Sequence, residues 1–262
     1  MNVKAQLKKW TFRITVTGLF IGALLIGIIL NPNLSYASET RYNNYTVFHD
    51  SPIDEGLIIH LNKATELLQK SELYNPNLKL DICLNDGSKY PVLIKEIFGD
   101  CFAKGFYNKV VLEGNPDYKG NYTEIRGYKW NLTQLLAHEI THCLQFNKFG
   151  LLKSNPIAKY PTWKWEGYPE YVARQNEDQK NLAKNIDRLI KTEQTDNNGW
   201  IEFGDGTGVV ISYYKWWLLT QYCMDIKKMT YQQILKDTTK EETIRQQMME
   251  WYNSQSSLSY QD

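Results

Sequence analysis

The feature that most constrains this chain is an uncharged apolar run near its start, ITVTGLFIGALLIGIIL, at residues 14–30. Four basic residues precede it: Lys4, Lys8, Lys9 and Arg13. Ser35 and Ala37 follow as small residues at the spacing that a signal peptidase recognises. A helix buried in a globular core would hardly be so free of polar side chains. A run of 17 residues is at the short end of what can span a bilayer.

Residues 1–37 are therefore predicted to be either a cleaved signal peptide or an N-terminal membrane anchor. Both alternatives place residues 38–262 outside the cytoplasm, because the basic flank stays on the cytoplasmic side. The protein is then either secreted or anchored to the membrane through residues 14–30.

The charge of residues 38–262 argues against nucleic acid as a partner. The chain has 30 basic and 29 acidic residues, and residues 1–37 hold four of the basic ones and none of the acidic ones. The remainder thus carries 26 basic against 29 acidic residues, a net charge of −3, and has no basic stripe. Nucleic acids and anionic membrane surfaces both need such a stripe.

The four cysteines leave two alternatives open. Cys83, Cys101, Cys143 and Cys223 are an even set in an exported chain, which permits two disulfides, and Cys83–Cys101 is the pairing that the sequence favours. Four buried free thiols are the alternative. The absence of any CxxC motif argues against a zinc knuckle and against thioredoxin-type chemistry.

Hydrophobic periodicity predicts an α+β fold, with a small N-terminal sheet and a mainly helical C-terminal lobe in residues 38–262. A helix is expected over residues 51–74, starting at Ser51 and Pro52. Extended segments are expected at 78–84, 90–94 and 105–114, and a loop is expected at 114–120. Residues from Asn131 onward are expected to be helical apart from a loop at 196–208, with a capping box formed by Thr230 and Gln233.

The segment LLAHEITHCLQF, at residues 135–146, carries the strongest functional pattern. Asn131 is a suitable N-cap and Gly150 a suitable stop, so a single helix is expected between them. His138 and His142 lie four residues apart on one face of it, which suits two imidazole ligands of one zinc ion. Glu139 is rotated by about 100° and suits a general base that takes a proton from a bound water.

A catalytic zinc needs a third protein ligand, and the sequence restricts the choice. No histidine follows His142, and Lys148 occupies the position of a third histidine in an HExxHxxGxxH pattern. His49 and His60 lie far upstream and are interpreted as structural.

The segment TWKWEGYPEYVARQ, at residues 162–175, supplies carboxylates instead. Pro169 predicts a helix that begins near Glu166, because proline is tolerated in the first turn. Glu166 is predicted to be the metal ligand, and Glu170 is predicted to accept an N–H from a ligand histidine. Two alternatives stay open: the two roles exchanged, or exposed first-turn carboxylates that complement the helix dipole.

HEITH followed by WEGYPEY resembles the gluzincin zinc peptidases, which include the aminopeptidase N and thermolysin groups. The resemblance implies a zincin-like fold, one Zn²⁺ per chain held by His138, His142 and Glu166, and a peptide or protein substrate. It also implies that the last strand before the metal helix, matched here by residues 105–114, is a sheet edge that pairs with the substrate backbone. Tyr213 best matches a tyrosine that assists the transition state in this group. No G-x-M-E-N motif is present, so aminopeptidase action is not implied.

The sequence therefore predicts an exported zinc metallopeptidase that hydrolyses peptide bonds with a zinc-activated water and Glu139 as general base. An intramembrane protease is excluded because the metal helix is too polar and only one span is present. The alternative is a protein that is not an enzyme: a non-catalytic zincin-fold module that binds a peptide or serves in assembly. Its sheet edge would hold the peptide without cleaving it.

Overall fold

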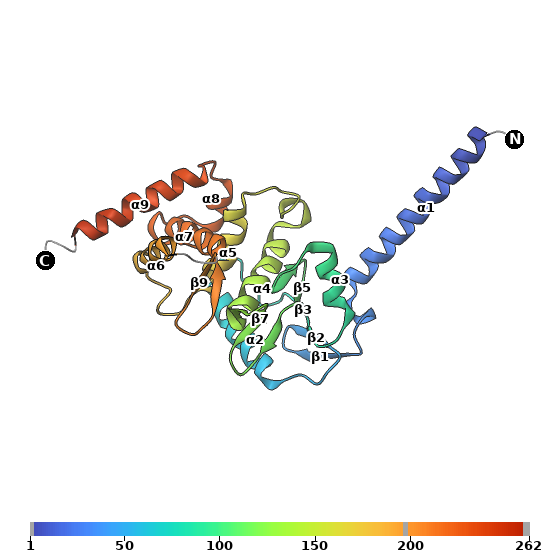
Figure 1. Cartoon of the computed structure of the whole chain (residues 1–262), viewed down its shortest axis with the longest axis horizontal. Helices are drawn as coiled ribbons and strands as arrows, with labels where there is room; N and C mark the ends of the chain where they lie inside the picture. The colour runs from blue at the N-terminus through green and yellow to red at the C-terminus, as the bar shows by residue number, and fades with distance from the viewer. Residues whose placement is uncertain (1–2, 196–198, 259–262) are drawn as a thin grey trace.

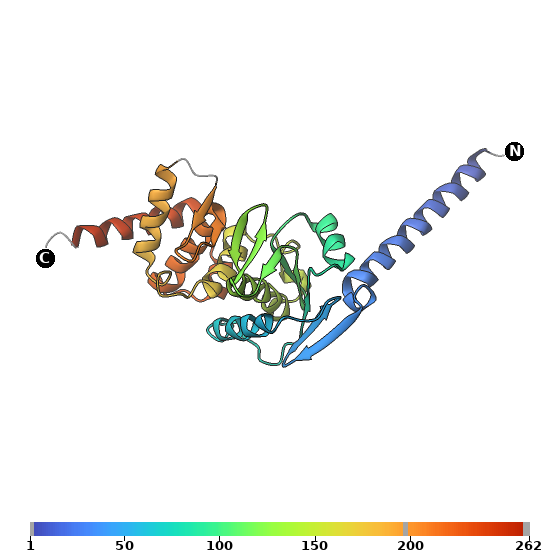
Figure 2. The same ribbon diagram turned by 60° about the horizontal axis from the view of Figure 1, so that its bottom comes forward.

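A computed structural model describes residues 3–195 and 199–258, and it has the expected α+β class. A sheet-bearing first half is followed by a helical second half (Figure 1). Helix α1 (Val3–Leu30) projects away from both halves, and helix α9 (Glu241–Leu258) lies at the opposite end of the molecule (Figures 1 and 2).

The main sheet has five strands within the described residues, in the order β1-β2-β3-β5-β4. These are β1 (Ser38–Tyr42), β2 (Tyr45–His49), β3 (Leu80–Cys83), β4 (Ala103–Phe106) and β5 (Lys109–Leu112). β2, β3 and β5 run parallel to one another, while β1 and β4 are antiparallel edge strands. The expected strand at 78–84 is confirmed as β3.

Neighbouring residues of each central strand pack on opposite faces of this sheet, as strand geometry requires. One face joins the main core with helices α2 (Glu55–Leu68) and α4 (Leu132–Phe149), and its residues are Val47, Ile82 and Val110. The other face packs against helix α3 (Lys89–Phe98) and Tyr36, and its residues are Phe48, Cys83 and Val111.

Three predictions about the first half are wrong in detail. Helix α2 spans Glu55–Leu68 rather than residues 51–74. It begins at Glu55 because Asp54 caps it by accepting the Gly56 N–H, while the Ser51 N–H donates to Asp86. The segment 90–94 is helical rather than extended, because Ser88 caps α3 and Pro91 falls in its first turn. The segment 105–114 is not one strand, because the chain reverses at Tyr107 between β4 and β5.

The predicted loop at 114–120 is also wrong, since it contains part of a second, three-stranded antiparallel sheet. Its strands are β6 (Asn115–Asp117), β7 (Tyr122–Ile125) and β8 (Tyr128–Asn131). The predicted loop at 196–208 contains a short antiparallel pair, β9 (Trp200–Glu202) and β10 (Gly208–Val210). The part of that prediction at 196–198 lies outside the described residues.

The remaining chain is mainly helical, as predicted, but it has loops at residues 154–161 and 174–181 that the prediction did not include. Its α-helices before α9 are α5 (Thr162–Ala173), α6 (Leu182–Gln194), α7 (Ile211–Gln221) and α8 (Tyr231–Lys236). Short helical turns occur at η1 (Pro32–Leu34), η2 (Leu151–Lys153) and, in π form, η3 (Tyr222–Ile226). The predicted capping box of Thr230 and Gln233 is confirmed at the start of α8.

All four cysteines are free, so the predicted pairing of Cys83 with Cys101 is wrong. Cys83 is buried on the α3 side of the main sheet, and Cys101 is half-buried just before β4. Cys143 and Cys223 are buried in the main core. The alternative of free thiols is thus the correct one, with Cys101 less buried than the other three.

Helices α5 and α7 approach each other closely at Gly167. A Cβ atom at this position would lie 2.5 Å from the Trp216 carbonyl oxygen, and nearer still to the Thr220 hydroxyl. Because Glu166 precedes Gly167 on α5, this close approach helps to fix the position of a predicted site residue.

We predict that Gly167→Ala lowers the free energy of unfolding by about 1–3 kcal/mol, measured by denaturation of the detergent-solubilised chain. Without the clash, alanine in a helix would be favoured over glycine by about 1 kcal/mol. Gly204→Ala is the control, because a Cβ there meets open space. A Gly167→Ala variant more stable than the wild type would contradict the described packing of α5 on α7.

Candidate metal centre

Helix α4 places the two predicted imidazole ligands together. As predicted, Asn131 caps the helix by accepting the Gln134 N–H, and the helix ends before Gly150. His138 Nε2 and His142 Nε2 lie 3.2 Å apart, and both side chains are buried. One ligand atom from each of His138, Glu139 and His142 lies within 4.8 Å of the others, so this buried group could hold a metal ion.

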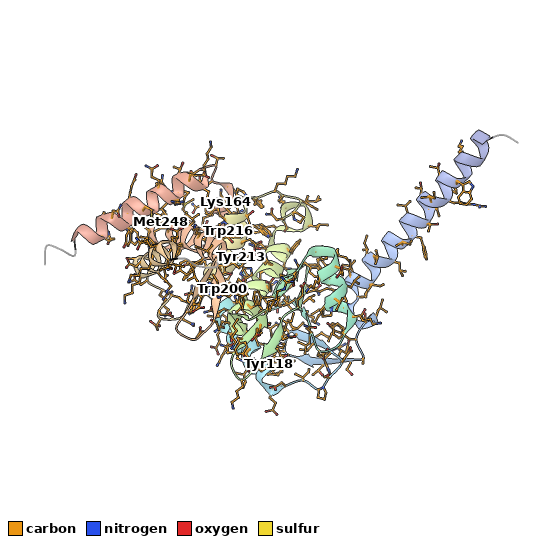
Figure 3. The ribbon with its side chains drawn as sticks, in the orientation of Figure 1. Tyr118, Lys164, Trp200, Tyr213, Trp216 and Met248 are labelled. Carbon is orange, nitrogen blue, oxygen red and sulfur yellow. The ribbon has the colours of Figure 1, made fainter. Side chains whose placement is uncertain are left out.

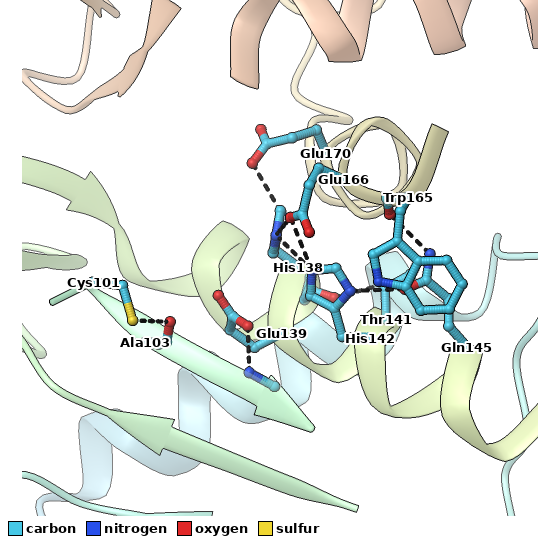
Figure 4. Close-up of polar contacts among 12 residues, drawn as sticks. Cys101, Ala103, His138, Glu139, Thr141, His142, Gln145, Trp165, Glu166 and Glu170 are labelled. Atoms are coloured by element: carbon cyan, nitrogen blue, oxygen red, sulfur yellow. Dashed lines mark hydrogen bonds and ion pairs between the residues drawn. The ribbon is translucent and has the colours of Figure 1, made fainter. Parts of the chain in front are cut away.

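Helix α5 brings Glu166 to the same point. Its Oε2 lies 3.1 Å from His142 Nε2 and 3.5 Å from His138 Nε2 (Figure 4). Tetrahedral ligands with zinc bonds of roughly 2.0–2.1 Å are about 3.3–3.4 Å apart. The three atoms therefore form a triangle of suitable size for three ligands of one tetrahedral ion, and the residues fit the predicted metal.

Glu139 lies beside this triangle and faces the edge of the main sheet. Its Oε2 accepts the Gly105 N–H of β4 at 2.5 Å. A Cβ at Gly105 would collide with the Glu139 backbone carbonyl, so the approach of β4 to α4 requires glycine here. Glu139 is thus held by the backbone N–H of Gly105, whereas Glu166 faces the Nε2 atoms of both histidines.

Glu170 contacts the opposite side of the His138 ring. Its Oε1 lies 2.8 Å from His138 Nδ1, while Glu166 faces Nε2 of the same ring. A proton on Nδ1 that points to Glu170 leaves Nε2 free as a ligand atom. This arrangement supports the roles predicted for the two glutamates rather than their exchange, and both are too buried to be exposed first-turn carboxylates.

Arg174 is a partner of Glu170 that the sequence did not reveal. It directly follows the last residue of α5, contacts Glu170 Oε2 and donates to Gln134 Oε1 at 3.0 Å. The Arg174 side chain is almost fully buried, and its guanidinium lies 5.0–5.7 Å from the ring centres of Trp130, Phe203 and Trp217. The i, i+4 spacing of Glu170 and Arg174 was the available signal.

Gln145 is a second residue that the sequence did not reveal. Its Oε1 lies 2.7 Å from His142 Nδ1, and its amide donates to the Trp165 carbonyl at 3.0 Å and to the Tyr231 hydroxyl. Because both amide hydrogens are used in this way, Oε1 must accept from Nδ1–H of His142. Nε2 of His142 is therefore left free to face the triangle.

The hydrogen bond from the Gln145 amide to the Trp165 carbonyl explains why Pro169 is tolerated inside α5 rather than in its first turn. Proline has no N–H, so the carbonyl four residues earlier, that of Trp165, loses its helical donor. Gln145 supplies the missing donor from α4. The predicted helix start near Glu166 is therefore wrong, and α5 begins at Thr162.

The charges of the site are strongly coupled. Burial disfavours a charge on His138, but the nearby carboxylates of Glu166 and Glu170 prevail and raise its pKa to about 10. Burial alone would raise the pKa of Glu166, yet the two imidazoles hold it well below its usual range. A metal ion needs neutral imidazoles, so binding must release protons and its affinity must fall as the pH is lowered.

A cavity of about 890 Å³ opens beside the triangle. His138, Glu139, His142 and Glu166 line it, together with strand β4. Its aromatic wall includes Trp200 and Tyr213, which lie near the junction of the two halves (Figure 3). The ring centre of Tyr213 is 5.9 Å from that of His138, so the tyrosine implied by the resemblance does lie at the site.

The two upstream histidines are not brought to the site. His60 Nε2 lies 2.6 Å from the Tyr118 carbonyl oxygen, and its Nδ1 lies 2.8 Å from the Thr133 hydroxyl. His49 contacts Thr40 and Ser51 at the end of β2. Both fit the structural interpretation.

No protein-family profile, curated protein or solved structure matches this chain. The geometry and chemistry of the site are therefore the basis for any function assigned to this protein.

We predict that the chain binds one divalent ion, tested with Zn²⁺, and that His138→Ala or His142→Ala abolishes binding. Either change removes one corner of the triangle and leaves two ligands. The measurement is metal content after dialysis. The control is His49→Ala, which removes a half-buried histidine outside the site and should leave the content unchanged. Stoichiometric zinc in a variant lacking both His138 and His142 would rule out the site.

Glu166→Gln and Glu170→Gln should differ in their effect on zinc affinity. Glu166→Gln removes a ligand and should weaken binding severely, whereas Glu170→Gln should weaken it by roughly 10–100-fold, as expected for the loss of a partner of a ligand histidine. Competition with a chromogenic chelator measures both. The reverse order would mean that the two roles must be exchanged.

Proposed function

We propose that this protein is an extracytoplasmic zinc metallopeptidase that hydrolyses peptide bonds with Glu139 as general base. The observation that carries the proposal is the triangle of His138, His142 and Glu166, with a second carboxylate, Glu139, beside it. A metal site with three protein ligands keeps a position for water or substrate, as catalytic zinc sites do. Zinc bound there would polarise a carbonyl group and lower the pKa of water.

Glu139 has the surroundings that a proton acceptor needs. Burial raises the pKa of its carboxyl group above the usual glutamate value, although His138 and His142 act in the opposite direction. Its contact with the Gly105 N–H orients the carboxylate at the wall of the cavity. From this position Glu139 takes a proton from the attacking water and passes it to the leaving nitrogen.

Strand β4 gives the cavity a place for an extended peptide. It bonds to β5 on one side, and no other described strand pairs with it. A peptide added to this edge would be held mainly by main-chain hydrogen bonds to β4 groups other than the Gly105 N–H, which already donates to Glu139. The resemblance implies that this edge is the last strand before the metal helix, at residues 105–114. That match is wrong in chain order, because β6, β7 and β8 lie between this segment and α4. The edge strand that lines the cavity is β4, since β5 lies inside the sheet.

Tyr213 is suited to donate a hydrogen bond in the same cavity. Burial and the nearby carboxylates of Glu166 and Glu139 raise its pKa well above the usual tyrosine value. Its hydroxyl group therefore stays protonated at neutral pH and can donate to an oxygen on which negative charge develops.

A non-catalytic peptide-binding or assembly module is the alternative function. The open edge of β4 inside the cavity favours it, because strand addition needs no chemistry. Glu139 separates the two functions, since a binding module has no use for a buried carboxylate beside a metal site.

Glu139→Gln should give a folded, zinc-loaded protein whose hydrolysis of a diverse peptide library is reduced by about 100-fold or more. The variant keeps the size of the side chain but cannot accept a proton. Zinc content and chelator-sensitive cleavage are measured together. Glu66→Gln, an exposed change on α2, is the control and should keep full activity.

Two outcomes would contradict this assignment. If the wild type and Glu139→Gln cleave nothing in the library yet bind the same peptide equally, the binding module is the correct function. If Glu139→Gln loses its zinc, Glu139 is a ligand rather than the base.

A further inference from the structure

Helix α1 contains an apolar segment that the rest of the described chain leaves uncovered except at its last turn. The segment Trp10–Leu30 has 21 residues and a mean hydropathy of 2.2, and none of it is buried. At 1.5 Å per residue it is about 30 Å long, which matches the hydrocarbon core of a bilayer. The uncharged run at residues 14–30 has 17 residues, which also exceeds the roughly 7–15 apolar residues of an ordinary signal peptide.

The residues directly after this segment belong to the folded domain. Tyr36 is only 8% exposed, and its ring centre lies 5.9 Å from those of Phe48 and Tyr90. Its hydroxyl donates to the Leu84 carbonyl oxygen at 2.8 Å. Tyr36 thus fills the core on the α3 face of the main sheet.

Hydrogen bonds join the same stretch to the start of α3 and to Asp50, just after β2. The Tyr90 hydroxyl donates to the Ile29 carbonyl oxygen at 2.6 Å, at the last turn of α1. Further along, Ser88 Oγ donates to the Ser35 carbonyl oxygen at 3.0 Å, and the Ala37 N–H donates to Asp50 at 2.7 Å. Strand β1 begins at the next residue, Ser38, which pairs with His49.

Cleavage after Ala37 would remove these contacts from the mature protein. Loss of Tyr36 would leave a space of aromatic size between Phe48 and Tyr90, which is among the more costly changes in a protein core. The Tyr90 hydroxyl would lose its acceptor as well. Residues 29–37 therefore form part of the folded domain, which does not fit their removal by a signal peptidase.

We propose that residues 1–37 are retained in the mature protein and that α1 anchors it in a lipid bilayer. Residues 29–37, which pack against the domain, then hold the domain directly at the end of the membrane-spanning helix. In both views α1 meets the domain beside α3 (Figures 1 and 2). Only residues 31–37 separate the span from β1, and Pro32 and Tyr36 among them are buried. The sheet-bearing half is thus held at the membrane surface without a flexible linker.

The first test is the fate of the full chain expressed in bacterial cells with an active signal peptidase. Intact mass should show residues 1–37 still present, and the protein should stay in the membrane fraction after alkaline carbonate and leave it only with detergent. A mature protein that starts at or near Ser38 and is found in the soluble fraction would overturn the proposal.

The second test asks whether Tyr36 is part of the folded domain and does not depend on the host. Tyr36→Ala should lower the Tm of the detergent-solubilised chain by roughly 10 °C, because it removes a buried aromatic ring. Tyr36→Phe should lower the Tm by much less than Tyr36→Ala, since the aromatic ring remains. Leu34→Ala is the matched control, because Leu34 is 67% exposed in the same segment, and it should change the Tm little. An unchanged Tm for Tyr36→Ala would show that the segment is dispensable, and the proposal would fail.

Discussion

The burial of α4 from its first residue to Gln145 is the constraint on which the rest of the structure depends. Every residue from Leu132 to Gln145 is buried, including two histidines, a glutamate and two glutamines. A buried polar group costs free energy unless it finds a partner. The surrounding elements meet this requirement one by one: β4 provides the Gly105 N–H, and α5 provides carboxylates and a carbonyl oxygen.

The same requirement links features of α5 that would each be unfavourable alone. Pro169 frees the Trp165 carbonyl, and Gln145 needs acceptors for its amide while it orients His142. Glu170 would be a costly buried charge without Arg174, which neutralises it while Glu170 orients His138. Both ring orientations therefore depend on contacts between α4 and α5, so this packing fixes the metal site as well as the core.

Local sequence signals predicted some elements well and failed on others for identifiable reasons. Asn131, Thr230 and the spacing of apolar residues act within a single helix, so α4 and α8 were correctly predicted. The apolar run at 90–94 was wrongly assigned as extended, because so short a run has no decisive periodicity. The small sheet of β6, β7 and β8 was missed because its strands have three or four residues each and the first of them carries a proline.

The sequence by itself determined the spacing of His138, Glu139 and His142, because 3.6 residues per turn fix these positions once the helix forms. It also determined that the apolar segment at 14–30 needs surroundings other than water. Only the tertiary structure decided that Glu166 faces Nε2 of His138 while Glu170 faces Nδ1, and that Tyr36 packs into the domain. These contacts join elements far apart in the chain, and their geometry depends on how whole helices and sheets pack rather than on any local pattern.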